Sequence, residues 1–177
     1  MSHDYDLNDH VYRLLLSEPF FAAVSRMVSK TANKSIPTAG VRVNPETAQF
    51  EMIYNPEFFE KLPENHVRGV LIHEFYHLIF DHVTSRMPDG VDKKQWNIAT
   101  DLAINSIIGK DNLPSFVCIP GGKNFEDYPQ MQAAEFYLEM LKRQQEQDQQ
   151  MENQGFDKGG NNDQKDESSG DIGRAHV

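Results

Sequence analysis

The chain has 177 residues, 38% of them hydrophobic, and carries a formal net charge of -10. This acidic balance argues against a general nucleic-acid binder and against binding to anionic membranes, because both need a surplus of Lys and Arg. A single cysteine, Cys118, excludes an internal disulfide framework and a Cys-cluster zinc site. No apolar run reaches the length of about 18 residues that a transmembrane helix needs, and the polar N-terminus is unlike a secretory signal, so we expect a cytoplasmic protein.

The N-terminal third of the chain predicts an interrupted helix followed by a β-hairpin. Apolar residues recur at helical spacing over 7–30, and Pro19 should kink or split this helix because proline has no N–H to donate. A polar link over 31–37 leads to two strands, over 39–43 and 49–54. The residues that join these strands have turn chemistry, which favours a hairpin.

Three further helices are expected. A wide apolar face predicts the first from about 63 to 86, and a second helix follows over 92–108. Proline and glycine mark 110–130 as an extended loop, and the last helix is expected over 131–143. The predicted fold class is α+β, mostly helical with a small β-hairpin or sheet.

The composition changes after this helix. Residues 144–177 are rich in Gln, Asn, Asp and Gly and contain few apolar residues. Such a segment buries too little surface to offset its chain entropy. We therefore expect one domain over 1–143 and a polar, disordered tail over 144–177, which could tether a partner protein or present a substrate-like segment.

The predicted 63–86 helix carries the motif HExxH, formed by His73, Glu74 and His77. Residues four apart differ by about 40° around a helix, so the two imidazoles project from one face and can share a metal ion. Glu74 lies about 100° from His73, beside the metal, where a carboxylate can take a proton from metal-bound water. Two imidazoles, an oxygen ligand and an open fourth position suit zinc.

The third ligand is less directly indicated by the sequence. On an unbroken helix His82 would point away from His73, and Asp81 has a better azimuth but a short side chain one turn further along. Asp101 lies in a polar stripe with Asn97 and Asn105 on the next helix, whose other residues are mostly apolar or small. A buried polar stripe needs a partner, so Asp101 is the expected third ligand, with His82 the alternative. Asn97 and Asn105 would orient the ligands, or would bond to neighbouring backbone instead.

The HExxH motif is typical of zinc peptidases. A peptidase must also hold its substrate and stabilise an oxyanion. The 39–54 hairpin could supply an edge strand that pairs with an extended peptide, or it could be an ordinary structural hairpin. A hydrogen-bond donor beyond the metal is needed in the transition state. The sequence offers four candidates for it without choosing among them: Tyr54, Tyr76, His82 and Arg86.

Several stretches of the chain resemble a known family. They are SEPFFAAV (17–24), IPTAGVRV (36–43), YNPEFF (54–59), GVLIHEFYHLIFDHVTSR (69–86), WNIATDLAINSII (96–108) and YPQMQAAEFYLEML (128–141). The family is the putative metallopeptidase domain family of bacterial and phage proteins, whose longer members carry a von Willebrand A-like domain after the peptidase-like part. The present chain has the polar tail in that place.

The resemblance implies a zincin-like fold in which the motif helix packs on the helix that carries Asp101. It also implies a zinc ion on His73 and His77, with Glu74 as the general base. The resulting prediction is a zinc-dependent endopeptidase acting on a peptide or protein substrate, with metal ligands His73, His77 and Asp101. The alternatives are a non-catalytic zinc module that binds a peptide or protein, against which the intact Glu74 argues, and zinc-assisted hydrolysis of a non-peptide bond.

Overall fold

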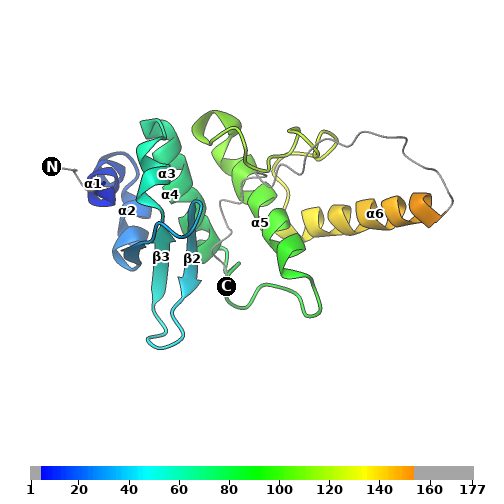
Figure 1. Ribbon diagram of the computed structural model, residues 1–177, viewed down its shortest axis with the longest axis horizontal. Coiled ribbons are helices and arrows are strands. Elements are labelled where there is room, and N and C mark those ends of the chain that lie inside the picture. The colour runs from blue at the N-terminus through cyan, green and yellow to red at the C-terminus, as the bar shows by residue number, and fades with distance from the viewer. Residues whose placement is uncertain (1–4, 154–177) are drawn as a thin grey trace.

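The computed structural model describes residues 5–153 and is an α+β arrangement, about half helical with one small sheet (Figure 1). The elements in chain order are α1 (Leu7–Ser17), α2 (Pro19–Arg26), β1 (Ser29–Ala32), β2 (Ala39–Val43), β3 (Phe50–Tyr54), α3 (Pro56–Glu60), α4 (Glu64–Ile79), α5 (Lys93–Ile108), the 3-10 helix η1 (Lys110–Asn112) and α6 (Ala134–Asn153). Within residues 5–153, none of the helices combines the length and apolar character required to cross a membrane.

The N-terminal helix is split at proline, as the sequence predicts. Glu18 leaves the helical conformation between α1 and α2, with φ -137°, and Pro19 occupies the first turn of α2. Proline is favoured there because the N–H it lacks would have no partner in the helix. The split lets Leu14 of α1 and Phe21 of α2 both turn toward the core.

The sheet has three strands in the order β1–β3–β2. The predicted hairpin is confirmed, since β2 and β3 pair antiparallel with Ala39 opposite Tyr54 and Val43 opposite Phe50. The prediction of helix up to residue 30 was wrong, because α2 ends at Arg26 and the chain then forms β1, which pairs parallel with β3. Strand β1 pairs with residues about twenty positions further along the chain. A pattern of apolar residues within a short segment gives no information on such a pairing.

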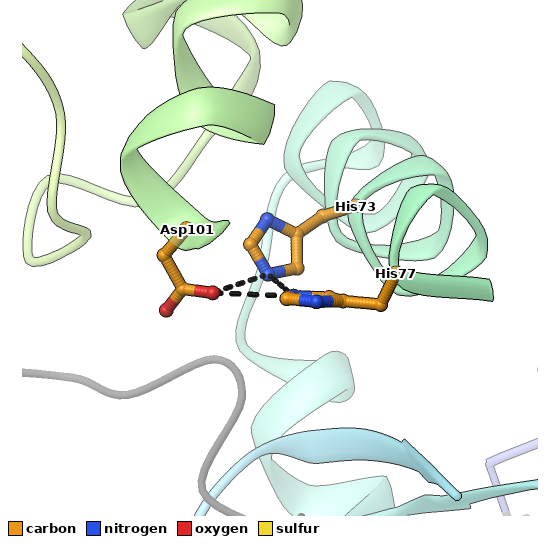
Figure 2. A group of neighbouring side chains, drawn as sticks. All are labelled: His73, His77 and Asp101. Atoms are coloured by element: carbon orange, nitrogen blue, oxygen red, sulfur yellow. Dashed lines mark hydrogen bonds and ion pairs between the residues drawn. The ribbon is translucent and has the colours of Figure 1, made fainter. Parts of the chain in front are cut away.

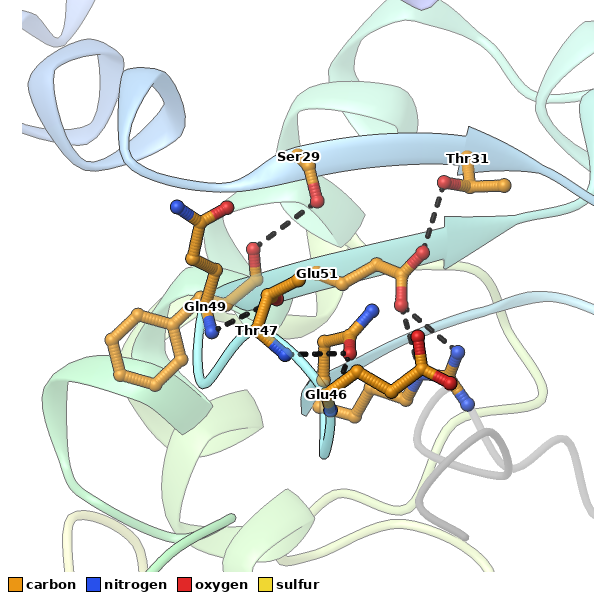
Figure 3. Close-up of polar contacts among 9 residues, drawn as sticks. Ser29, Thr31, Glu46, Thr47, Gln49 and Glu51 are labelled. Carbon is orange, nitrogen blue, oxygen red and sulfur yellow. Dashed lines mark hydrogen bonds and ion pairs between the residues drawn. The ribbon is translucent and has the colours of Figure 1, made fainter.

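One carboxylate links all three strands (Figure 3). Glu51 on β3 accepts hydrogen bonds from Arg42 Nε and Nη2 on β2 at 3.0 and 2.9 Å, and from Thr31 Oγ1 on β1 at 3.0 Å. Ser29 Oγ on β1 adds a bond to the carbonyl of Phe50. The hydrogen bonds from Arg42, and then that from Thr31, lower the pKa of Glu51. A shift of one residue in either pairing would break these contacts, so they help to fix the register.

Helix α4 is shorter than predicted. It begins after Pro63 and ends at Ile79 instead of continuing to Arg86. Phe80 leaves the helix, and Asp81 adopts φ 58°, in the left-handed region that only Gly and, less often, Asn and Asp enter readily. The backbone N–H of His82 then bonds back to the carbonyl of His77 at 2.9 Å. The chain therefore reverses at the end of α4 rather than extending from it.

Helix α4 runs very close to the segment after α5. A Cβ added to Gly69 would lie 1.8 Å from the backbone oxygen of Asn112 in η1, so only glycine fits there. On its other sides α4 buries Val70, Leu71 and Phe75 completely. Each such side chain contributes about 1.5–3 kcal/mol relative to leaving it exposed, which explains why this helix is held firmly in place.

Helix α5 agrees with its prediction, whereas α6 does not. The Asp92 side chain caps α5 by accepting from the backbone N–H of Gln95 at 3.0 Å, and Gly109, with φ 83°, ends it. The last helix, expected over 131–143, begins at Ala134 and continues to Asn153. Gln, Glu, Lys and Arg are good helix formers, so the polar composition after residue 143 does not by itself end a helix. The remainder of the expected tail, residues 154–177, lies outside the described residues.

The buried apolar residues form two clusters, which meet where α4 packs on α5. The first is built by α1, α2, the sheet, α3 and α4, and includes Leu7, Leu14, Phe21, Val28, Val41, Met52, Phe59, Val67, Val70, Leu71 and Phe75. The second is built mainly by α5 and α6, and includes Trp96, Ala99, Leu102, Ala103, Tyr128, Ala134, Tyr137 and Leu138.

Candidate metal centre

Three side chains converge between α4 and α5 (Figure 2). His73 and His77 come from successive turns of α4, and Asp101 comes from α5. The Nε2 atoms of the two imidazoles are 3.0 Å apart, and Asp101 Oδ1 lies 3.1 Å from His77 Nε2 and 3.5 Å from His73 Nε2. The structure thus brings together the three residues that the sequence predicts as metal ligands.

All three side chains are withdrawn from solvent. His73 is 0% exposed, His77 1% and Asp101 4%. Burial alone raises the pKa of Asp101, but the hydrogen bonds and charges of His73 and His77 outweigh it and hold this pKa well below its ordinary value. Burial correspondingly lowers the pKa of His73, and the Asp101 carboxylate, with help from Glu74 and Asn105, outweighs it and raises this pKa. The site therefore stabilises a carboxylate next to groups that can carry positive charge.

The spacing of these atoms fits a tetrahedral metal ion. Two ligand atoms bound at about 2.0–2.1 Å to one tetrahedral centre, the distances typical of zinc, lie about 3.3 Å from each other. The three separations here run from 3.0 to 3.5 Å. Among the described residues, this is also the group of His, Cys, Asp and Glu side chains whose ligand atoms lie close enough to hold an ion. The donor set of two imidazoles and a carboxylate is one that a divalent metal accepts.

Asn105 orients the first imidazole. His73 Nδ1 donates to Asn105 Oδ1 at 2.7 Å, and Asn105 Nδ2 donates to the backbone oxygen of Cys118 at 2.7 Å. A proton held on Nδ1 leaves Nε2 of His73 with a lone pair facing His77 and Asp101, which is the tautomer a metal needs. The prediction that Asn105 orients a ligand therefore matches its contacts, whereas for Asn97 it stays a prediction.

Glu74 follows His73 on α4. It is 0% exposed, and its charge acts on the neighbouring His73. A fully buried carboxylate is costly unless a nearby group stabilises it. Glu74 lies on the same helix as both imidazoles, one residue on from His73, and its role as a general base stays a prediction.

His82 does not point away from the site, contrary to the prediction made for an unbroken helix. Its imidazole lies with its centroid 5.4 Å from that of His77 and 5.8 Å from that of Trp96, and it is 6% exposed. Burial, and then the charge of Arg86, lowers the pKa of His82 to about 4. Within the described part of the chain, the three converging ligand atoms come from His73, His77 and Asp101, without His82.

Of the other candidate oxyanion donors, Arg86 has its guanidinium bonded elsewhere, and the two tyrosine rings pack against neighbouring aromatic rings. Arg86 makes two bonds to Glu135 at the start of α6, at 2.7 and 2.9 Å, and donates to the carbonyl of Phe80 at 3.3 Å. The ring of Tyr54 packs edge-on against Phe59 in the first cluster. Tyr76 stacks on Phe80.

Tyr76 also lines a shallow pocket between α2, α4 and the end of α5, on another side of α4 from the three ligands. Asp81, the weaker ligand candidate, accepts a hydrogen bond from the Ser85 hydroxyl.

Two contacts around the site have main-chain acceptors that the sequence does not identify. Trp96 Nε1 donates to the backbone oxygen of His82 at 3.2 Å, which fixes the loop after α4 to the start of α5. Asn105 reaches the backbone of Cys118 in the loop that follows α5. Both acceptors are main-chain carbonyls, which every residue has, so the sequence holds no signal that would single them out.

The chain is similar to a known family and to a protein of Thermotoga maritima. The family described as "Putative metallopeptidase domain" matches residues 2–176, nearly the whole chain. An uncharacterized protein of Thermotoga maritima is 39% identical over 62 residues, which are 35% of this chain and 16% of that protein. The chain thus matches about a sixth of the length of this relative. No solved structure matches.

Proposed function

The chain belongs to the putative metallopeptidase domain family, and from this premise we propose that it is a zinc-dependent endopeptidase of the HExxH type, with a zincin-like fold. The observation that carries the proposal is the convergence of His73 Nε2, His77 Nε2 and Asp101 Oδ1 in a buried site, in a chain of a metallopeptidase family. In this reading three protein ligands leave a position for water and substrate, as in catalytic rather than structural zinc sites.

His73, His77 and Asp101 would hold the metal. When bound, zinc supplies a Lewis acid that polarises the scissile carbonyl and lowers the pKa of water toward about 7. Asn105 contributes by keeping the proton of His73 on Nδ1, so that Nε2 stays available as a ligand. The burial of all three ligands keeps bulk water out, which strengthens each of these electrostatic interactions.

Glu74 would move the proton. Its carboxylate accepts a proton from the attacking water and delivers it to the nitrogen of the departing amine, so that the same oxygen serves first as base and then as acid. Its buried position beside His73 supports this role. A positioned general base contributes about 10²–10⁴-fold to a rate.

The peptide substrate would pair with strand β2. In the strand order β1–β3–β2, β2 is an outer strand of the described sheet, and it contacts α4, the helix of the HExxH motif. An extended peptide can add itself to such an edge through main-chain hydrogen bonds, which hold it with little regard to its side chains. This arrangement favours a protein or peptide substrate over a small ester or amide.

The test uses an unfolded protein such as casein as substrate, with the wild type, Glu74→Gln and Glu64→Gln compared at equal zinc loading. Glu64 is an exposed glutamate at the start of the same helix, so it controls for the chemical change. We expect Glu74→Gln to lose turnover by about 10²–10⁴-fold while it retains zinc, and Glu64→Gln to keep both. A wild type that binds zinc and cleaves no substrate would instead support the non-catalytic binding module.

The metal itself is tested by elemental mass spectrometry of wild type and Asp101→Ala. We expect about one zinc per wild-type chain and a large loss in the variant. Zinc that is kept in Asp101→Ala would remove Asp101 from the ligand set, and no zinc in either protein after reconstitution would contradict the metallopeptidase proposal.

A further inference from the structure

The turn at the end of α4 places a third histidine next to the HExxH histidines. Asp81 enters the left-handed region with φ 58°, and the N–H of His82 bonds to the carbonyl of His77 at 2.9 Å. Because these two features reverse the chain, the His82 ring lies against His77 instead of continuing along the helix. A left-handed conformation is unfavourable for a residue other than glycine by about 1–2 kcal/mol, so the surrounding structure must stabilise the turn.

The surroundings of His82 hold it in this place. Its ring packs against His77, Phe80 and Trp96, at centroid distances of 5.4, 5.6 and 5.8 Å. Trp96 Nε1 also donates to the His82 carbonyl at 3.2 Å. Both the main chain and the ring of His82 are therefore fixed relative to α4 and α5, the two helices that carry the predicted ligands.

The imidazole nevertheless has an unsatisfied polar atom. His82 is 6% exposed, and its Nδ1 is buried with no hydrogen-bond partner among the described residues. Leaving a buried donor or acceptor unsatisfied costs about 1–3 kcal/mol. An apolar side chain of similar shape would avoid this cost, so a purely structural role does not explain a histidine here.

The charged groups around His82 do not supply the missing partner. The charges that act on it are those of Arg86, Asp101, Glu135 and His73. Arg86 and Glu135 bond to each other, and Asp101 faces His73 and His77. His82 is also outside the group of three ligand atoms that lie within 4.8 Å of one another. The His82 ring lies against His77, so a molecule bound at the predicted ligands would be close to it.

We propose that His82 is a substrate-contacting residue, whose Nδ1–H donates a hydrogen bond to the carbonyl oxygen of a peptide bound at the His73–His77–Asp101 site. This inference rests on the proposed peptidase function. The bond strengthens as the carbonyl oxygen gains negative charge, so it acts mainly on the transition state. His82 thereby takes the oxyanion-donor role, whereas the guanidinium of Arg86 is bonded to Glu135.

The test compares His82→Leu and His82→Asn with wild type. Leucine fills the space without a donor, and asparagine places an amide nitrogen near the position of Nδ1. His66→Asn is the control, since His66 lies in the first turns of α4, seven residues before His73. The readouts are zinc per chain, the affinity of the cobalt-substituted protein for acetohydroxamate from its visible absorption, and kcat and KM on casein.

We expect all variants to retain zinc. We expect His82→Leu to bind acetohydroxamate at least about tenfold more weakly and to lower kcat by about 10²–10³-fold with little change in KM, since removing one oxyanion donor has that effect. We expect His82→Asn to recover most of the acetohydroxamate affinity, and His66→Asn to match wild type in every readout.

Two results would overturn the proposal. One is a His82→Leu protein with wild-type acetohydroxamate affinity and kcat. The other is loss of zinc from both His82 variants but not from His66→Asn, which would make His82 a support of the metal rather than a substrate contact. If the wild type binds zinc and acetohydroxamate but cleaves no peptide, the peptidase proposal fails by itself, and the acetohydroxamate comparison still decides whether His82 contacts the bound molecule.

Discussion

Asn105 joins one metal-ligand candidate to the loop after α5, and its two roles can be separated by substitution. Its Oδ1 accepts from His73 Nδ1 and its Nδ2 donates to the Cys118 carbonyl, both at 2.7 Å in a buried place. Asn105→Ala removes both bonds. Asn105→Asp keeps the acceptor for His73 but sets a carboxylate oxygen against the Cys118 carbonyl.

The magnitudes follow from these contacts. Loss of a group that orients a metal-binding histidine typically weakens metal affinity by about 10–100-fold, or about 1.4–2.8 kcal/mol. Each buried group left without a partner costs about 1–3 kcal/mol. Asn105→Ala leaves two such groups without a partner, so we expect it to weaken zinc binding by about 10–100-fold and to lower the free energy of unfolding of the metal-free protein by about 2–6 kcal/mol. Asn105→Asp should lose stability but bind zinc within about threefold of wild type.

Zinc affinity is measured by competition with a chromophoric chelator, and stability by urea unfolding of the metal-free protein. Asn112→Ala is the control, because the side chain of Asn112 is exposed and bonds only locally, to the carbonyl of Ile108. The reasoning is refuted if Asn105→Ala binds zinc as wild type does, or if the alanine and aspartate variants lose zinc affinity equally.

Three further outcomes are expected. Gly69→Ala should lower the free energy of unfolding by about 1–3 kcal/mol or more, because the new methyl group meets the Asn112 carbonyl; thermal unfolding against wild type checks this, and an unchanged melting temperature would contradict it. Glu51→Gln should be less stable than wild type above pH 4.5. The difference in the free energy of unfolding should vanish as pH falls through the lowered native pKa of Glu51, because the Glu51 carboxylate of wild type is then protonated and no longer pairs with Arg42. Urea unfolding across pH 2–7 measures this difference, and a constant difference over that range would contradict the prediction. Stripping the metal with a chelator should lower stability by about 2.7 kcal/mol relative to protein at a free zinc concentration of 100 times the Kd, and an unfolding curve indifferent to zinc would contradict metal binding by the native state.

The sequence predicts the ligand group because the two rules behind this prediction concern residues that are close together in the chain. Two histidines four residues apart must share a helix face, and a polar stripe on a buried helix must find a partner. Those two rules bring these residues together in the structure: His73, His77 and Asp101 lie within hydrogen-bonding or ion-pair distance of one another, and Asn105 bonds to His73. Neither rule needs the tertiary fold beyond the packing of α4 on α5.

The position of His82 could not be predicted in this way. It depends on one residue, Asp81, whose left-handed conformation ends α4 at Ile79. Helix ends of this kind are usually marked by glycine, and the stretch after His77 has none before Gly90. Strand β1 was not predicted for a different reason. Its structure comes from pairing with β3 and not from its own side-chain pattern.

The two ligand-bearing helices belong to different hydrophobic clusters, and this has a mechanical consequence. Valine, leucine and phenylalanine side chains of α4 lie in the first cluster, whereas Trp96, Ala99 and Leu102 of α5 lie in the second. Packed helices slide past each other by about 1–2 Å in ordinary conformational shifts, whereas metal–ligand distances vary by only about 0.2 Å. A metal ion held by both helices would therefore fix α4 and its hydrophobic cluster in one alignment with α5 and its cluster. By thermodynamic reciprocity, a partner that shifts α4 relative to α5 would change the affinity of the site for the metal.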